Sequence, residues 1–387
     1  MRDLSQNGKK RLPIVKIVLL TALLLSITTG LVYFLNIERY VFKGPKTVVR
    51  LITDSGLKKD QGRTNILLLG IGGSGHDGPD LTDTIILASI DQDSGDVVMV
   101  SIPRDLWVPA ESTKINHVYA YGEDVDGQGL EVAKNTVEEL LGIPIHYAFR
   151  IDFNGFIKAV DLVGGLSLNV DTPFTDPKYP ISGKENDLCD LTIETEEKNG
   201  VQIQIVKDAT GSAIPISEIN EKNDPFTCRY ETLTFEKVIT KMDGATSLKF
   251  VRSRHGTNGE GSDFARSARQ QKVIMAFREK VISQESLKDP KRIIQLLSTL
   301  DASIDTDIGD EEIPLFAKLV PKIGDENIHR IVLDATRPQS VLEFGLSQNY
   351  SGQSVVIPKN GDWDTLKNYL IGEIYKNEQS KTQQDTN

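Results

Sequence analysis

Apolar residues form short runs and helical spacings through the middle of this chain. Residues 66–69, 84–90 and 97–102 are brief apolar runs, each followed by glycine, aspartate or proline, and this pattern predicts buried β-strands. Between residues 130 and 141 the apolar side chains recur every three or four positions, which predicts a helix that ends at Gly142. The alternation of the two patterns predicts a layered α/β/α sandwich.

The same signals continue towards the C-terminus. They predict strands over 147–151 and 166–170 and a helix over 153–163. After an interval, residues 245–254 have the pattern of a strand and residues 264–283 that of a helix.

Two stretches differ from this pattern. Residues 173–242 are rich in charged and turn-forming residues, with one clear apolar run at 201–206, and we interpret them as an insertion in a domain over 63–300. Residues 301–376 mix helical and strand patterns and are interpreted as an accessory segment. The polar residues 377–387 are predicted to form a disordered tail.

An uncharged, apolar stretch at residues 17–37 predicts a transmembrane helix. At about 1.5 Å per residue it matches a hydrocarbon core of roughly 30 Å. A cleaved signal peptide is the alternative, but the apolar stretch is long for one and no A-x-A site follows it. The expected order is a short tail (1–16), the membrane helix and a stem (38–62).

Lysine and arginine flank both ends of this stretch, with only a slight excess on the N-terminal side. That bias favours a cytoplasmic N-terminus. No second comparable apolar span follows. The expectation is therefore a single-pass protein of the cell membrane whose main domain lies outside the cytoplasm.

Charge and cysteine content narrow the function. The net charge of −11, without a tract rich in lysine or arginine, gives no attraction to nucleic acid, so an anionic ligand requires a local arginine cluster. Cys189 and Cys228 lack C-x-x-C spacing. They are either two separate thiols or, in a domain outside the cytoplasm, a disulfide.

A glycine-rich loop at 70–75 (GIGGSG) follows the first predicted strand. It matches the dinucleotide-binding pattern G-x-G-x-x-G, but that fold requires a helix next, whereas the next predicted element is a strand. We therefore exclude a dinucleotide site. Asp77, Asp80 and Asp83 follow the glycines, and they are either ordinary turn residues or oxygen ligands for a magnesium ion.

Arginines gather near two later elements. Arg252 and Arg254 share one face of the predicted strand 245–254, and Arg266, Arg269 and Gln270 lie within one turn of the following helix. Burying an unpaired charge costs several kcal/mol, so an anion is expected among these groups.

Arg104, just after a buried strand, is a further candidate for this anion site. Guanidinium groups and a helix N-terminus together bind phosphate groups well, and the sequence therefore predicts a site for two phosphates. The alternative is a purely structural network in which the arginines pair with Glu260 and Asp263.

Several motifs follow one another across residues 63–285. They are NILLLG at 65–70, LTDTI at 81–85, SIPRD at 101–105, KIN at 114–116, DLVGG at 161–165, FVRSRH at 250–255 and DFARSARQ at 263–270. In this order they resemble the LytR–CpsA–Psr family of envelope glycopolymer transferases.

The resemblance implies a membrane-anchored phosphotransferase. Such an enzyme takes a glycopolymer from a polyprenyl-pyrophosphate carrier and joins it to a hydroxyl of a cell-wall acceptor, implied to be peptidoglycan, with release of polyprenyl phosphate. The cofactor implied is Mg²⁺ (or Mn²⁺). The matching positions are Asp83 for the metal-associated aspartate and Arg104, Arg252, Arg254, Arg266 and Gln270 for the diphosphate, with Lys114 as a lesser member.

The chain departs from the family pattern at two positions. Gly72 stands where the family commonly has an aspartate, and Leu81 where it commonly has an arginine. Asp77, and after it Asp80, are the candidates to supply the missing metal ligand.

The resemblance leaves other activities open. The same site acting with water would be a pyrophosphatase, and a non-catalytic protein would bind the carrier alone. A transcriptional role is disfavoured, because residues 1–16 are too few to fold as a DNA-binding domain. Because the resemblance also implies export, it favours a disulfide between Cys189 and Cys228.

Overall fold

The computed structural model describes residues 56–76, 78–198, 201–208, 210–220, 223–282, 300, 303–309, 311–337 and 339–376. Within these ranges no helix has both the length and the apolar composition to cross a membrane. The predicted membrane helix, the tails at 1–16 and 377–387 and most of the stem lie outside the described residues.

Contacts divide the chain into two units. The first is Met1–Leu57 with Gly309–Ala317, and it holds most of helix α10 (Ile313–Leu319). The second unit is Lys58–Ile308 with Lys318–Asn387. The second unit contains every other element described below.

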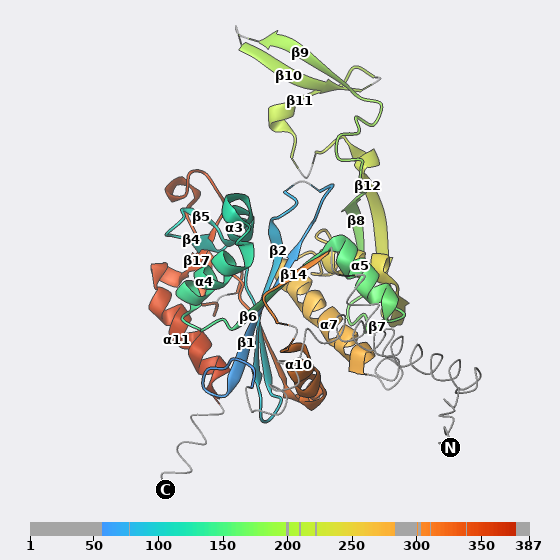
Figure 1. Ribbon diagram of the computed structural model, residues 1–387. Coiled ribbons are helices and arrows are strands. Elements are labelled where there is room, and N and C mark those ends of the chain that lie inside the picture. The colour runs from blue at the N-terminus through green and yellow to red at the C-terminus, as the bar shows by residue number, and fades with distance from the viewer. Residues whose placement is uncertain are drawn as a thin grey trace, which may run out of the picture. The chain divides into compact units, whose positions relative to one another are not determined.

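A six-stranded sheet forms the centre of the second unit (Figure 1). Antiparallel pairing joins β14 to β6, β1 to β2 and β2 to β3, whereas β6 pairs with β1, and β3 with β15, in parallel. In order across the sheet the strands are β14 (Ile304–Thr306), β6 (Tyr147–Asp152), β1 (Arg63–Ile71), β2 (Thr82–Asp91), β3 (Val97–Ser101) and β15 (Ile328–Val332).

Both faces of this sheet are covered, which explains why its strands are continuous apolar runs. On one face, Leu67, Leu87 and Val100 are fully buried in a cluster with residues of three helices. These are α3 (Val118–Asp126), α4 (Gly129–Leu141) and α11 (Trp363–Ile374). The predicted helix end is confirmed, because Gly142 caps α4 in the left-handed conformation.

A second apolar cluster is built from helices α5 (Phe153–Leu162), α6 (Gly244–Arg252) and α7 (Asp263–Ile282) and from two ribbons. The ribbons are β7 (Leu166–Asn169) with β13 (Ile239–Met242) and β8 (Phe174–Pro180) with β12 (Tyr230–Phe235). Figure 1 shows α5 and α7 on the side of the sheet away from α3, α4 and α11. The predicted layered α/β/α sandwich is confirmed.

The predicted strand over 245–254 is wrong, because this segment is helix α6 followed by a loop. The Asp243 carboxylate accepts a hydrogen bond from the Thr246 N–H and so caps the helix. Its buried positions 244, 247, 248 and 251 have helical spacing. A Cβ at Gly244 would lie 2.2 Å from the Ile157 carbonyl oxygen, so glycine permits the close contact between α6 and α5.

The interpretation of 301–376 as an accessory segment is also wrong. Two of the central strands, β14 and β15, come from it, and Leu333, Leu342 and Leu366 are buried in the first apolar cluster. β14 and β15 are three and five residues long, and their partners are distant in the sequence, so no local pattern predicts them. It also contains the ribbon of β16 (Leu342–Phe344) and β17 (Val356–Pro358).

The insertion is narrower than 173–242. Strands β8, β12 and β13 belong to the body of the domain, which leaves a separate three-stranded sheet and short turns between β8 and β12. That sheet consists of β9 (Thr192–Lys198), β10 (Val201–Lys207) and β11 (Ala213–Pro215). A disulfide joins Cys189 to Cys228 at the base of the insertion, which confirms the predicted pairing.

The remaining short elements connect these layers. They are β4 (Trp107–Val108), β5 (Thr113–Lys114), η1 (Ile115–His117), η2 (Ile216–Glu218), η3 (Thr227–Arg229), η4 (Val320–Lys322), η5 (Asp325–Asn327), η6 (Ser347–Asn349) and η7 (Lys359–Gly361).

Candidate functional site

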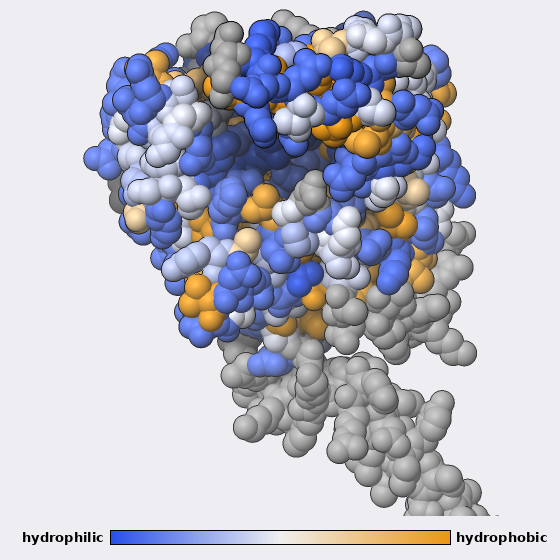
Figure 2. Space-filling model, turned by 90° about the horizontal axis from the view of Figure 1, so that it is seen from above, coloured by the Kyte–Doolittle hydropathy of each residue, from blue (hydrophilic) through white to orange (hydrophobic). Residues whose placement is uncertain are grey.

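A pocket lies at the edge of the sheet where β2 begins and β3 ends. Its polar wall combines residues from the start of β2, from the turn after β3 and from the first turns of α7. Figure 2 looks onto the side that is at the top of Figure 1, where the β1–β2 connection lies, and shows a hollow surrounded mainly by hydrophilic residues. The polar side chains on the wall are Asp83, Arg104, Asp105, Asp263, Arg266 and Gln270.

Arg104 and Asp83 form the central ion pair of this wall. The Arg104 Nη1 lies 2.6 Å from Asp83 Oδ1, and the Arg104 Nε lies 3.7 Å from Asp105 Oδ2. The Lys114 Nζ in turn donates to Asp105 Oδ1 over 2.7 Å. Burial alone would lower the pKa of Arg104, but the bond to Asp83 and the nearby carboxylates outweigh it and raise that pKa. Arg104 is therefore a permanent cation.

Arg254 and Arg266 lie near the same pair. The Arg254 Nη2 lies 3.9 Å from Asp83 Oδ1, and the Arg266 Nη2 lies 2.6 Å from Asp263 Oδ1. Burial and then the charges of Arg266 and Arg104 lower the pKa of Arg254 to about 10. Burial is likewise the main reason that the pKa of Arg266 is lowered. Crowded guanidinium groups of this kind are stabilised when an anion binds between them.

Asp176 positions the loop that carries Arg254. Its Oδ2 accepts hydrogen bonds from the Ser253 Oγ over 2.6 Å, from the Arg254 N–H over 3.1 Å and from the His255 N–H over 3.2 Å. Only 1% of the Asp176 side chain is exposed. This buried carboxylate therefore fixes the direction in which the loop leaves α6.

Gln270 lies one helical turn after Arg266 and faces the same pocket. Its Nε2 donates to the Thr84 Oγ1 over 2.9 Å, which links α7 to the start of β2. The predicted group of Arg104, Arg254, Arg266 and Gln270 is thus brought together in space. With Lys114 the site has four cationic side chains, and the carboxylates that line the pocket are those of Asp83, Asp105, Asp263 and Asp334.

Arg252, by contrast, packs against aromatic rings and does not line the pocket. Its guanidinium carbon lies 4.1 Å from the centre of the Phe153 ring, and its Nη1 donates to the Tyr179 hydroxyl over 3.4 Å. The His76 ring contacts the same Phe153 edge-on at 5.0 Å. The interpretation that Arg252 and Arg254 share one strand face fails because the first ends α6 and the second lies in the loop.

Arg269 does not face the pocket, contrary to its prediction as a substrate-binding residue. Its side chain is 4% exposed and donates to the carbonyl oxygens of Phe250, Ser253 and Glu260 over 2.7 to 2.8 Å. It also pairs with the Glu260 carboxylate at 2.6 Å. Arg269 therefore holds the loop between α6 and α7. For this arginine the alternative given by the sequence, a structural pairing with Glu260, is confirmed.

The acidic loop offers one clear ligand for a divalent cation. Asp83 is 44% exposed at the pocket, whereas Asp77 lies outside the described residues. Among the described residues, metal-ligating side chains bring three donor atoms together only at Asp187, Cys189 and Cys228, where the two cysteines form the disulfide. Asp80 and Asp83 do not belong to a group of this kind. A single carboxylate suits Mg²⁺, which keeps several waters and takes further oxygens from a substrate phosphate.

Sequence reasoning missed the apolar floor of the pocket. Ile85 and Ile102 come from the central strands, but Leu333, Phe344 and Val356 come from the segment that was interpreted as accessory. The backbone supports this arrangement, because the Val356 N–H donates to the Asp105 carbonyl over 2.9 Å. Asp105 and Asp263 were not predicted to be site residues, although both stand inside the recognised motifs; Asp263 was expected only as a structural partner of the arginines, and it does pair with Arg266.

Crystal structures with this fold include those of two bacterial proteins. A Streptococcus agalactiae protein superposes with a TM-score of 0.53 and 21% identity, covering 84% of this chain and 90% of its own. Bacillus subtilis TagV superposes with a TM-score of 0.51 and 18% identity, covering 82% and 98%. At these identities the likeness concerns the fold alone.

Sequence relatives include two proteins named polyisoprenyl-teichoic acid–peptidoglycan teichoic acid transferase TagU. That of Oceanobacillus iheyensis is 27% identical over 263 residues, which cover 66% of this chain and 62% of the relative. That of Enterococcus faecalis is 24% identical over 298 residues, which cover 76% and 78%. The match thus spans about three-fifths of the first relative. The LytR–CpsA–Psr family model matches residues 41–370, most of the chain, and this protein therefore belongs to the LytR–CpsA–Psr family.

Proposed function

We propose that this protein transfers a glycopolymer from a polyprenyl-pyrophosphate carrier to a hydroxyl of peptidoglycan. The observation that carries the proposal is the gathering of three arginines near Asp83: Arg104 and Arg266 line the pocket, and Arg254 lies 3.9 Å from the Asp83 carboxylate. Guanidinium groups can bind phosphate oxygens through two parallel hydrogen bonds, which favours a diphosphate over a neutral ligand.

The floor of the pocket supports a lipid-linked donor. Ile85, Ile102, Leu333 and Val356 line the same pocket as Arg104 and Arg266. The cavity is small, about 60 Å³, so it suits the part of the carrier next to the diphosphate and not a whole polyprenyl chain. In this arrangement the arginines and Gln270 hold the phosphate oxygens.

The proposed reaction is a phosphoryl transfer. The acceptor oxygen forms a bond to the glycan-side phosphorus, the bond from that phosphorus to the bridging oxygen breaks, and polyprenyl phosphate leaves with the electron pair. Asp83 lies where it can take the proton of the attacking hydroxyl or hold a metal ion. Mg²⁺ bound there would neutralise phosphate charge. The arginines stabilise the charge that develops in the transition state.

The names of the relatives support the substrate class. Both are named as transferases between a polyisoprenyl-linked teichoic acid and peptidoglycan. Transfer of a carrier-linked cell-wall polymer is therefore the activity we propose here.

We further propose that residues 17–37 anchor the chain and that the domain faces away from the cytoplasm. The Cys189–Cys228 disulfide supports this location, because disulfides persist in oxidising compartments and are rare in the cytosol.

Product analysis with the purified full chain tests the proposal. The protein in detergent is incubated with Mg²⁺, a polyprenyl-pyrophosphate-linked glycan and peptidoglycan fragments, and the products are separated by mass spectrometry. Transfer predicts a phosphodiester-linked conjugate together with polyprenyl phosphate. Release of free glycan phosphate, with no conjugate, would instead identify a pyrophosphatase, and no turnover at all would identify a carrier-binding protein.

A further inference from the structure

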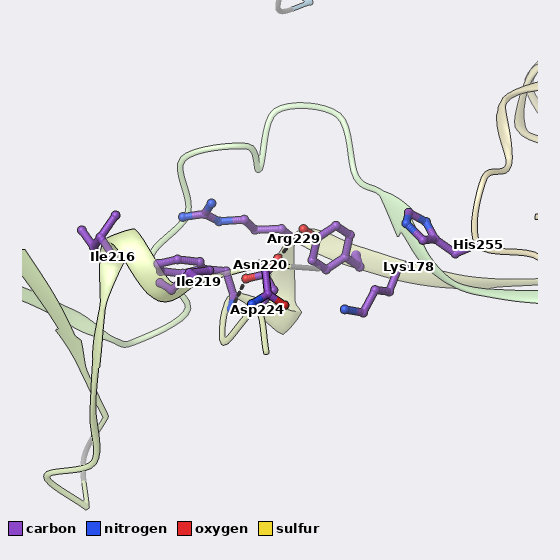
Figure 3. A pocket seen from close by; sticks show the side chains of 9 residues that line it. Lys178, Ile216, Ile219, Asn220, Asp224, Arg229 and His255 are labelled. Atoms are coloured by element: carbon purple, nitrogen blue, oxygen red, sulfur yellow. Dashed lines mark hydrogen bonds between the residues drawn. The ribbon is translucent and has the colours of Figure 1, made fainter. Parts of the chain in front are cut away.

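A second pocket lies where the insertion meets β8 and the loop after α6. Its volume is about 340 Å³, within the range of small-ligand sites. Figure 3 shows Lys178 and His255 on one side of it and Ile216 and Ile219 on the other, with Asn220 and Asp224 between them.

Cations, rings and hydrogen-bonding groups line this pocket together. The Arg229 guanidinium carbon lies 3.8 Å from the centre of the Phe226 ring, and its Nε donates to the Asp187 carbonyl over 2.7 Å. The Tyr230 hydroxyl donates to Asp224 Oδ2 over 2.5 Å. Lys178 and Arg229 against the single carboxylate of Asp224 give the lining an excess of positive charge.

The disulfide holds one wall of the pocket in place. Cys228, directly before Arg229, is joined to Cys189, while the Arg229 Nε is bound to the backbone at Asp187. The wall is therefore tied to the base of the insertion through Cys228 and through the side chain of Arg229. A preorganised wall of this kind lowers the entropic cost of binding a ligand.

The second pocket adjoins the diphosphate site through two consecutive residues. Arg254 reaches to within 3.9 Å of Asp83, and His255, the next residue, lines the second pocket. Asp176 accepts hydrogen bonds from the backbone N–H groups of both. The loop that carries Arg254 and His255 thus connects the two sites.

We propose that this second pocket binds the acceptor, a saccharide that carries carboxylates, and this inference rests on the proposed function. The transfer requires a second substrate whose hydroxyl reaches the phosphorus held by Arg254. The ring of Tyr230 can contact the apolar face of a sugar unit, and Asn220 and Asp224 can bond to sugar hydroxyls. Lys178 and Arg229 recognise the carboxylates, which peptidoglycan carries on its peptide stems.

Calorimetric titration of the full chain in detergent tests the acceptor site. The probe is a purified tetrasaccharide of alternating N-acetylglucosamine and N-acetylmuramic acid with its peptide stems. Lys178→Gln and Arg229→Gln are each expected to weaken its binding about tenfold or more, the loss expected for one charge-assisted hydrogen bond. Lys237→Gln, at an exposed lysine of the turn between β12 and β13, is the matched control and should bind as the wild type does.

Binding of polyprenyl pyrophosphate is measured on the same variants and should be unchanged in all of them. Thermal unfolding checks that each variant is folded. If Arg229→Gln does not fold, Lys178→Gln alone provides the test. Wild-type affinity for the tetrasaccharide in both folded variants, or no saturable binding by the wild type, would overturn the acceptor site. Equal affinity for an uncharged chitin tetrasaccharide would also overturn it. If the two variants selectively lose tetrasaccharide binding but the wild type shows no transfer, the result would support the acceptor site and contradict the proposed reaction.

Discussion

The Arg104 guanidinium and the Asp83 carboxylate lie 2.6 Å apart although 21 positions separate them in the chain. Asp83 is at the start of β2 and Arg104 is in the turn after β3, and the neighbouring antiparallel strands bring the two together. The Ile102 N–H donates to the Ile85 carbonyl over 2.9 Å, which extends the pairing of the strands to the edge of the pocket. The positions of Arg104 and Asp83 are thus both fixed by the backbone pairing of β2 with β3.

Arg104, Arg254 and Arg266 should act as one diphosphate clamp. Replacing any of them by alanine is expected to lower transfer by on the order of 10²-fold or more, because a positioned charge is removed from developing phosphate charge. Arg254→Lys should restore little of the activity, since a point charge cannot replace a bidentate guanidinium. Steady-state transfer with the defined donor measures these effects.

Arg252 and Arg330 provide the comparisons for this series. Arg252 lies on Phe153 and Tyr179, so Arg252→Ala should reduce transfer less than Arg254→Ala does. Arg330 is exposed on β15, and Arg330→Ala should leave transfer unchanged. Wild-type transfer in all three clamp variants would show that these arginines are structural.

Asp83→Asn should abolish metal-dependent transfer, because it removes the carboxylate beside the arginines. Asp77→Asn tests whether a second ligand replaces the one lost at Gly72, and a raised Mg²⁺ requirement in that variant would support it. The measurement is the Mg²⁺ concentration that gives half-maximal transfer. Unchanged Mg²⁺ dependence in both Asp77→Asn and Asp80→Asn would leave Asp83 as the sole protein carboxylate on the metal.

Asp176 should stabilise the fold in its ionised form. Burial alone would raise its pKa, but hydrogen bonds from the Ser253 hydroxyl and three backbone N–H groups outweigh it, so that the folded-state pKa is lowered. The stabilisation is therefore present above the unfolded pKa of about 4 and is lost as the pH falls through the folded value.

Asp176→Asn is accordingly expected to lower the free energy of unfolding by about 1–3 kcal/mol at pH 7. The difference from the wild type should shrink below pH 4. Urea unfolding at pH 7 and pH 3 measures it, and a difference of equal size at both values would contradict the assignment.

The disulfide should stabilise the insertion. Its two cysteines are 39 positions apart, and closing a loop of that length contributes roughly 3–4 kcal/mol by the chain-entropy estimate. The double variant Cys189→Ser with Cys228→Ser should therefore be cleaved faster by proteases between β8 and β12. Protein from its native compartment, denatured without reductant, should resist alkylation. Two reactive thiols in that experiment would refute the pairing in the cell.

The topology predicts the behaviour of reporter fusions after residue 62. A reporter that works only after export should be active at this junction, because the proposed membrane helix at 17–37 would leave the domain outside the cytoplasm. A reporter that works only in the cytoplasm should be inactive. The opposite result would remove the proposed access to peptidoglycan.

Local patterns determined much of this protein. The apolar runs at 66–69, 84–90 and 97–102 predict central strands because these strands are buried on both faces, so their side chains are apolar on either side. The strand that follows the glycine loop excludes a dinucleotide site, and the structure has β2 there. The ordered motifs predict the family, and four of their residues do meet in one pocket.

Tertiary structure alone decided the rest. Residues 244–252 form a helix because Asp243 caps it and its buried face packs on α5, contacts that a strand pattern of alternating apolar residues does not reveal. β14 and β15 are too short to show a pattern, and they exist because a distant strand offers them hydrogen bonds. The roles of the arginines follow from the same cause. Arg266 faces the pocket while Arg269, three residues later, is buried against carbonyl oxygens, because the direction of each side chain depends on packing between elements far apart in the sequence.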